Sequence, residues 1–304
     1  MTIVLALIFF QVELPDPKVR EIEADYVVLV PAAHAEAIRP LVRHRAAQGL
    51  HPAIVTTENM KKAFPDLRDF IRFASKEWKK GPRFLLLAGD VDSIPAHKQR
   101  SHYQTDRLPN DEELATDHLF GCPGEDSNAT VAVGRLPADS KEELAAMVKR
   151  IIAYEADPPI GAWRRKINFV VGEGNFNPVI DALMEIQFAA LLNAHVPPAY
   201  DLEVAYAKSS SRYSPYPPRF AANAVRLLNE GALFYVYVGH GHRTGFDTLT
   251  WKEETYDIFD RKNLKEVAVT GGAPIMIVMA CSTGEFDAAS EDCIGEDLLK
   301  LPQG

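Results

Sequence analysis

The stretch FYVYVGHGHRTG, residues 234–245, starts as a run of aromatic and β-branched residues and continues into two histidines separated by one glycine. A short apolar run of this kind is typical of a buried strand. The stretch PIMIVMACSTGEF, residues 274–286, repeats the arrangement with a cysteine after the apolar run. Reactive groups of parallel α/β proteins gather beyond the carboxyl ends of the strands. The two stretches therefore predict one site that uses both a histidine and a cysteine.

Short apolar runs alternate with helical patterns along the chain, and this alternation predicts parallel sheets in an α/β fold. Besides the two stretches above, strands are expected at residues 25–31, 52–56, 83–90, 130–136, 166–172 and 202–207. The expected helices begin near Pro40, near Leu67, at Ser140, at Pro178 and near Arg219. The helix at Ser140 has the strongest signal, because Ser140 and Glu143 form a capping box ahead of an apolar stripe.

A polar stretch at residues 97–114 marks the expected boundary between two α/β subdomains. We expect an N-terminal segment at residues 1–23, an N-terminal subdomain at residues 24–97 and a catalytic subdomain at residues 98–304. The first ten residues form an apolar run that is too short to span a bilayer. We interpret this run either as a secretion signal or its remnant, without the usual basic start and cleavage site, or as an N-terminal strand.

The composition is that of an ordinary globular protein, with 304 residues of which 47% are hydrophobic and 25% are charged. The formal net charge is -9, and no basic stripe offsets it. This balance argues against a nucleic-acid partner. Beyond the N-terminal run no segment is long and apolar enough to cross a membrane, so we expect no stable membrane insertion.

The chain has three cysteines, Cys122, Cys281 and Cys293. This number is odd and too small for a disulfide framework. A pair between Cys281 and Cys293 would leave neither as a free nucleophile. No two cysteines have the CxxC spacing of a zinc ribbon. A zinc site built from Cys281, Cys293, His240 and His242 is an alternative, since these residue types bind zinc.

A reaction that uses Cys281 and His240 together explains why each of these residues follows an apolar strand. A cysteine attacks as the thiolate, and a nearby imidazole favours the thiolate and later protonates the leaving amine. Gly239 and Gly241 permit a tight turn and a close backbone approach around His240. The backbone N–H groups of Gly241 and Cys281 are then candidates for an oxyanion hole. A single cysteine or histidine at a strand end is more often structural, so only the two residues together indicate catalysis.

Four further motifs accompany the two strand ends in a fixed order, and together the six resemble the gingipain family within the caspase-like cysteine peptidases. They are LLLAGDVDSIP (85–95), TDHLFG (116–121), VAVGRLPADSKEELAAMVKRIIAYE (131–155) and CIGEDLL (293–299). The resemblance covers about residues 24–301. It implies a caspase-like three-layer α/β/α fold with mainly parallel sheets, and a cysteine endopeptidase that acts on proteins or peptides.

The resemblance also implies roles for individual residues. Cys281 becomes the nucleophile and His240 its general base and acid, while His242 becomes a local packing or hydrogen-bonding residue. Arginine-specific gingipains have a glutamate that helps to orient the histidine, and this chain has Thr130 there. Caspases use a backbone carbonyl as the third group, so this difference does not exclude activity.

Two acidic residues correspond to family positions that bear on substrate or ion binding. Glu143 falls where gingipains that prefer basic residues have an acid, although it also completes the capping box. Asp117 matches a family acid at the cleft or at a calcium site. The resemblance makes a structural calcium ion possible, while the chemistry itself requires no cofactor. No EF-hand-like loop is visible in the sequence.

Three expectations follow for the whole chain. The protein is expected to be secreted or exposed on the cell envelope. Two alternatives to an endopeptidase remain, a sortase-like transpeptidase of the same family and a catalytically silent gingipain-like binding module. Gingipain-like and caspase-like domains continue beyond the cysteine into another strand and a wall of the substrate pocket. We therefore expect the catalytic subdomain to be truncated at its C-terminus.

Overall fold

The computed structural model describes residues 13–100, 113–174, 186, 187, 190, 192, 194–288 and 291–302. The apolar run at the N-terminus and most of the helix expected from Pro178 lie outside the described residues. The chain divides into two compact units. The first comprises Met1–Ile152 with Asp287–Ser290, and the second comprises Ala153–Phe286 with Glu291–Gly304.

The first unit is built on a four-stranded sheet in the order β2-β1-β3-β6. Its strands are β1 (Tyr26–Val30), β2 (Pro52–Thr56), β3 (Phe84–Ala88) and β6 (Ala132–Leu136), and all three pairings are parallel. Every residue of β1 is buried. This burial on both faces explains why the strand is a continuous apolar run without alternation.

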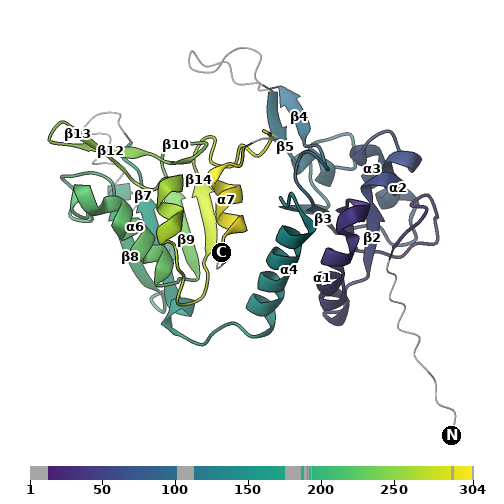
Figure 1. Ribbon diagram of the computed structural model, residues 1–304, viewed down its shortest axis with the longest axis horizontal. Coiled ribbons are helices and arrows are strands. Elements are labelled where there is room, and N and C mark those ends of the chain that lie inside the picture. The colour runs from purple at the N-terminus through teal and green to yellow at the C-terminus, as the bar shows by residue number, and fades with distance from the viewer. Residues whose placement is uncertain are drawn as a thin grey trace, which may run out of the picture. The chain divides into compact units, whose positions relative to one another are not determined.

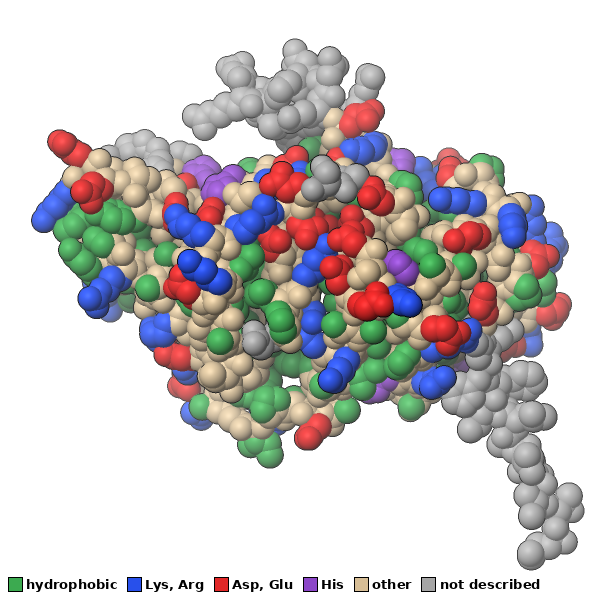
Figure 2. All heavy atoms as spheres, viewed as in Figure 1, with side chains coloured by type: hydrophobic (Ala, Val, Ile, Leu, Met, Phe, Trp, Pro, Cys, Tyr) green, Lys and Arg blue, Asp and Glu red, His purple; other side chains and the backbone are tan. Residues whose placement is uncertain are grey.

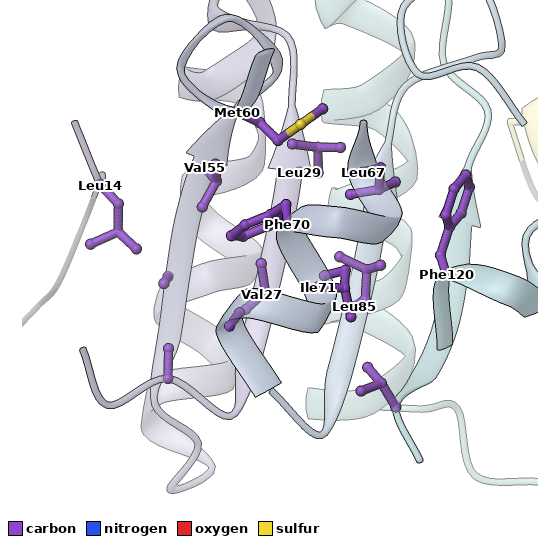
Figure 3. Packing of buried hydrophobic residues seen from close by; sticks show 14 of the residues in the cluster. Leu14, Val27, Leu29, Val55, Met60, Leu67, Phe70, Ile71, Leu85 and Phe120 are labelled. Atoms are coloured by element: carbon purple, nitrogen blue, oxygen red, sulfur yellow. The ribbon is translucent and has the colours of Figure 1, made fainter. Parts of the chain in front are cut away.

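Helices cover both faces of this sheet. On one face α1 (Ala35–Ala47) and α4 (Lys141–Ala156) pack against Val28 and Val30 of β1, and on the other α2 (Thr57–Ala63) and α3 (Leu67–Glu77) pack against Val27 and Leu29 (Figure 1). Figure 3 shows Phe70 and Ile71 of α3 facing Val27 and Leu85 of the sheet. The first unit therefore has the three layers that the sequence predicted.

The helix α1 begins at Ala35, five residues before the predicted start at Pro40, so this prediction was wrong. A short 3-10 turn, Ala32–His34, leads into the helix and starts it early. Pro40 cannot donate a backbone hydrogen bond to the carbonyl of Glu36. Glu36 and Pro40 are both exposed, so water can bind that carbonyl and the helix continues through the proline.

The first unit continues well past residue 97, where the sequence indicated a boundary. Strand β6 pairs with β3 along its whole length, from Ala132 opposite Phe84 to Leu136 opposite Ala88. It forms one edge of the same sheet. A short antiparallel pair, β4 (His97–Arg100) with β5 (Glu113–Thr116), and the 3-10 helix His118–Gly121 precede it. The long-range pairing of β6 is why the polar stretch does not separate the two compact units.

The second unit is also built on a parallel four-stranded sheet, in the order β14-β9-β7-β8. Its strands are β7 (Lys166–Val171), β8 (Asp201–Tyr206), β9 (Phe234–Val238) and β14 (Ile275–Met279). The helices α6 (Phe220–Asn229) and α7 (Ile294–Lys300) contribute Val225, Leu228 and Ile294 to one apolar cluster with Tyr235 and Tyr237 of β9. The predicted α/β class with mainly parallel sheets is confirmed.

Two small hairpins follow β9, and the sequence analysis did not predict them. The first pairs β10 (Gly241–His242) with β11 (Gly245–Phe246), and the second pairs β12 (Thr248–Trp251) with β13 (Glu254–Asp257). Three further 3-10 helices, Ala162–Arg165, Pro217–Arg219 and Arg261–Glu266, connect the larger elements. The first hairpin begins directly after His240 and contains His242.

The surface carries charges of both signs. Figure 2 shows lysine and arginine side chains intermixed with aspartate and glutamate over the face in view. Many are paired, as Arg226 is with Glu230 at 2.7 Å and Lys166 is with Glu230 at 2.8 Å. Exposed pairs of this kind contribute little to stability, so the buried clusters are the main support of the fold. Within the described ranges no helix is long and apolar enough to cross a membrane.

Candidate active site

The sheet of the second unit brings the two predicted reactive residues to neighbouring strand ends. Strands β9 and β14 are adjacent and parallel, and their last residues, Val238 and Met279, are partners in the register. Gly239 continues the pairing by donating its N–H to the Met279 carbonyl at 3.2 Å. His240 and Cys281 each lie two residues beyond these last partners. The parallel register therefore places the loops that carry them at the same edge of the sheet, after adjacent strands.

Gly241 brings the loops that follow the two strands into contact. A Cβ atom on Gly241 would lie 2.6 Å from Cγ2 of Thr283 and 2.9 Å from the carbonyl oxygen of Cys281. Real Cβ atoms do not approach other atoms so closely, so only glycine fits. The close backbone approach that the sequence indicated at this glycine is thus the contact between the histidine loop and the cysteine loop.

The chain makes a tight, strained turn directly after Cys281. Ser282 has a φ of 56°, a left-handed conformation that is costly for a residue other than glycine. Thr283 donates its N–H to the Cys281 carbonyl at 2.7 Å, and its own carbonyl accepts the N–H of Gly295 at 3.1 Å. Backbone strain of this kind persists where the surrounding structure fixes it, and it is concentrated at functional sites.

The three cysteines differ in exposure, and all three are free thiols. Cys281 is exposed, whereas Cys122 and Cys293 are buried. Burial raises the pKa of the Cys293 thiol to about 11, and the N–H of Cys293 donates to the carboxylate of Glu296 at 2.8 Å. Cys293 is therefore a protonated residue at the start of α7, and the pairing with Cys281 that we considered is not formed. Among the described residues, no three potential metal ligands converge.

The two histidines have different surroundings. His240 is exposed, and its carbonyl accepts a hydrogen bond from the hydroxyl of Tyr237 at 2.5 Å. His242 is also exposed, and its Nδ1 lies 3.2 Å from Oγ1 of Thr244 within the turn of the β10–β11 hairpin. Tyr237 was not among the residues that the sequence singled out. A tyrosine inside an otherwise apolar buried strand is the signal for it, because a buried hydroxyl needs a hydrogen-bond partner.

Asp117 and Glu143 belong to the first unit. Both carboxylate oxygens of Asp117 accept from Arg135, at 2.7 Å from Nε and 2.8 Å from Nη2. The remaining nitrogen of this nearly buried guanidinium donates to the carbonyls of Gly89 and Ile94, each at 2.9 Å. Arg135 thereby joins three of the sequence motifs. This fork geometry is typical of a structural ion pair.

Glu143 takes part in the N-terminal cap of α4. Its N–H donates to Oγ of Ser140 at 3.2 Å, as the predicted capping box requires. Its carboxylate accepts the N–H of Asp139 at 3.0 Å. In a regular capping box it would accept the N–H of the N-cap residue, Ser140, which is the next residue. Thr130 also lies in the first unit, where it is exposed and donates its N–H to the Gly121 carbonyl at 2.9 Å.

The second parallel sheet, with cysteine and histidine at adjacent strand ends, is the arrangement expected of caspase-like cysteine peptidases. The sequence profile of Peptidase family C25 matches residues 20–304, and the chain belongs to this family. This result confirms the predicted gingipain family of cysteine peptidases.

Known proteins similar to this chain agree with the family. Gingipain R2 of Porphyromonas gingivalis (strain ATCC BAA-308 / W83) is 25% identical over an alignment of 285 residues that covers 90% of this chain and 34% of that protein. Gingipain R1 of Porphyromonas gingivalis is 24% identical over an alignment of 285 residues that covers 90% of this chain and 25% of that protein. The chain thus spans about a third or less of the length of these relatives.

Solved structures agree on the fold. The crystal structure of the Arg specific cysteine proteinase gingipain R matches with a TM-score of 0.69 at 21% identity, covering 92% of this chain and 60% of that one. The complex of the Porphyromonas gingivalis RgpB pro- and mature domains matches with a TM-score of 0.69 at 21% identity, over 91% and 60% of the two chains. The predicted caspase-like fold is confirmed.

Proposed function

We propose that the chain is a cysteine endopeptidase in which Cys281 is the nucleophile and His240 is its general base and acid. The Cys281 thiolate attacks the carbonyl carbon of a peptide bond and forms a tetrahedral oxyanion. The His240 imidazolium gives its proton to the leaving amine as the C–N bond breaks, and a thioester remains. His240 then takes a proton from water as the water oxygen attacks the thioester. The C–S bond breaks, the acid product leaves, and the Cys281 thiolate is restored beside the His240 imidazolium.

The observation that carries this proposal is the register of β9 and β14. It brings His240 and Cys281 to adjacent strand ends. The glycine contact between the two loops supports the same pairing. Exposure of Cys281 leaves its sulfur accessible to a substrate, and the other two thiols are buried.

The oxyanion hole is proposed from the backbone N–H groups of Gly241 and Cys281. His242 and Gly245 flank a two-residue turn, so they form the hydrogen-bonded pair of the β10–β11 hairpin. Gly241 and Phe246, the next pair, are then a non-hydrogen-bonded pair, and the N–H of Gly241 points away from β11. This direction supports Gly241 as a donor that is not used by its own hairpin.

The substrates that we propose are proteins or peptides with lysine or arginine at the cleaved position. One of the solved structures that share the fold is of an Arg specific cysteine proteinase, which supports this preference. Glu143 is the candidate counter-charge in this chain. We also propose secretion or exposure on the cell envelope, based on the likeness to gingipains and on the apolar N-terminal run.

Alkylation with iodoacetamide tests the proposal, with cleavage of denatured casein as the activity. The label should enter Cys281 first, because this thiol is exposed, and casein cleavage should fall in proportion to the labelled fraction of Cys281. Mass spectrometry of the digested protein locates the label. Full labelling of Cys281 with casein cleavage retained would overturn the proposal.

A further inference from the structure

Tyr237 places a buried hydroxyl group directly beneath the histidine loop. The residue is fully buried in β9, and burial raises the pKa of its hydroxyl. The hydroxyl therefore stays protonated and donates to the carbonyl oxygen of His240 at 2.5 Å. It also accepts the backbone N–H of Asp247 at 3.1 Å. The hydroxyl is thus a donor to the loop that carries His240 and an acceptor from the residue that follows the β10–β11 hairpin.

The ring of Tyr237 is fixed independently of its hydroxyl. It stacks on the ring of Phe246, with centroids 3.8 Å apart and planes 4° from parallel. Two glycines leave the space that the hydroxyl occupies, because a Cβ on Gly239 would lie 2.7 Å from this oxygen and a Cβ on Gly172 would lie 3.1 Å from it. The first glycine of the Gly-His-Gly-His sequence is therefore needed to accommodate the hydroxyl of Tyr237.

The bond from Tyr237 acts on a whole peptide group. The carbonyl of His240 and the N–H of Gly241 belong to one planar, trans peptide unit, so they point in opposite directions. No cis peptide bond occurs in the described residues. Holding the His240 carbonyl toward Tyr237 therefore holds the Gly241 N–H away from it. A rotation of this peptide plane would turn the N–H away from its present direction.

We propose that Tyr237 is a positioning residue, whose hydroxyl locks the His240–Gly241 peptide plane and thereby aims the Gly241 N–H at the oxyanion. This inference rests on the proposed cysteine peptidase function. The hydroxyl touches neither the substrate nor the thiol, and it acts through the peptide group that it holds. Because an oxyanion stabiliser works only in the correct direction, the lock affects turnover more than substrate binding.

The matched variants Tyr237→Phe and Tyr235→Phe test the lock. Tyr235 lies on the same strand and is equally buried, and its hydroxyl donates to the carbonyl of Ala224 at 3.3 Å, away from the histidine loop. Each variant loses one buried hydroxyl and keeps its ring. Casein cleavage is measured over a range of casein concentrations, at a temperature where melting curves show every variant folded. The rate at which iodoacetamide alkylates Cys281 is measured in parallel.

We expect Tyr237→Phe to lower kcat by about tenfold to a hundredfold, with KM within about twofold, because misdirecting one oxyanion donor costs rate in this range. Alkylation forms no oxyanion, so its rate should stay near that of the unchanged protein. Tyr235→Phe should leave both rates within about twofold. Equal kcat values in the two variants, or a parallel fall of kcat and alkylation in Tyr237→Phe, would overturn the inference. Casein cleavage retained in Cys281→Ala would instead overturn the proposed function, and the inference with it.

Discussion

His240 and His242 are separated by one residue, yet only His240 lies at the end of a strand beside that of Cys281. His242 is engaged by Thr244 inside its hairpin. We expect His240→Ala to slow alkylation of Cys281 by iodoacetamide at pH 7 by about tenfold, because a free cysteine is only a few per cent thiolate at this pH.

The matched variant His242→Ala should leave the alkylation rate within about twofold. The measurement is the rate of label incorporation at Cys281, followed by mass spectrometry under the same conditions for both variants. A larger decrease in His242→Ala than in His240→Ala would reverse the roles that we assign to the two histidines.

The neighbouring positions of His240 and Cys281 could be predicted from the sequence because each follows an apolar strand, and strand ends meet at one edge of a parallel sheet. Tyr237 was missed because its role depends on a bond to a backbone carbonyl three residues away. Side-chain patterns carry no information on backbone carbonyl directions. The strain at Ser282 was missed for the same reason, since serine is not a residue that marks a positive φ.

At the scale of elements, Asp25 links the start of β1 to the residues before β2 and β3. Its carboxylate is almost fully buried, accepts the N–H of His51 at 2.6 Å and lies 2.7 Å from Nζ of Lys80. Burial alone would raise the pKa of Asp25, but the bonds from Lys80 and His51 outweigh it and hold the pKa below its usual value. The ionised form is therefore bound more favourably in the folded protein than in the unfolded one.

We expect Asp25→Asn to lower the free energy of unfolding at pH 7 by about 1–3 kcal/mol, because it removes the buried charge that pairs with Lys80. A lowered folded-state pKa gives stability that is present above the unfolded pKa of about 3.9 and is lost as pH falls through the folded pKa. The difference between the two proteins should thus shrink as the pH falls below about 4.

Urea unfolding at several pH values measures this difference, and Asp92→Asn is the control. Asp92 is exposed, so the same chemical change there should cost less than about 0.5 kcal/mol. A difference for Asp25→Asn that does not shrink in acid would contradict the role of its ionised carboxylate.

Glu143 has two possible roles, as part of the cap of α4 and as the counter-charge of the substrate, and one substitution can distinguish them. Glutamine can replace Glu143 in the bond to the Asp139 N–H, and it removes the charge. If Glu143 is the counter-charge of the substrate, Glu143→Gln should lower kcat/KM for a peptide with arginine at the cleaved position by about tenfold. A peptide with alanine there should be cleaved as before. Glu142→Gln is the charge-matched control, because Glu142 is the preceding residue and is exposed.

The comparison of kcat/KM on the arginine and alanine peptides decides between the roles. Equal effects of Glu143→Gln on both peptides would leave the residue as a helix cap alone. The structure already differs from the motif in one detail, because the carboxylate reaches Asp139 and not the N-cap residue. Sequence spacing predicts that a cap forms, but the choice between two adjacent N–H groups depends on the entry angle of the chain.

For the whole molecule, the alternation of strands and helices was enough to predict parallel sheets, because central strands such as β1 and β9 are continuous apolar runs. The burial expected for the apolar run of β14 was wrong, because β14 is an edge strand on which Ile275, Ile277 and Met279 are exposed. The extent of the units was not predictable in the same way. Strand β6 pairs with β3 across a polar stretch, and pairing between distant segments is not encoded in local composition. The hairpins after β9 were missed because strands of two residues, as in β10 and β11, have no measurable periodicity.

The substitution Cys281→Ala, assayed on casein, tests the central claim most directly. Cys281 is exposed, so the melting temperature should be unchanged. Turnover should fall by roughly a millionfold, the loss known for removal of a peptidase nucleophile. A folded Cys281→Ala protein that cleaves casein within tenfold of the unchanged rate would contradict the assignment of Cys281 as the nucleophile.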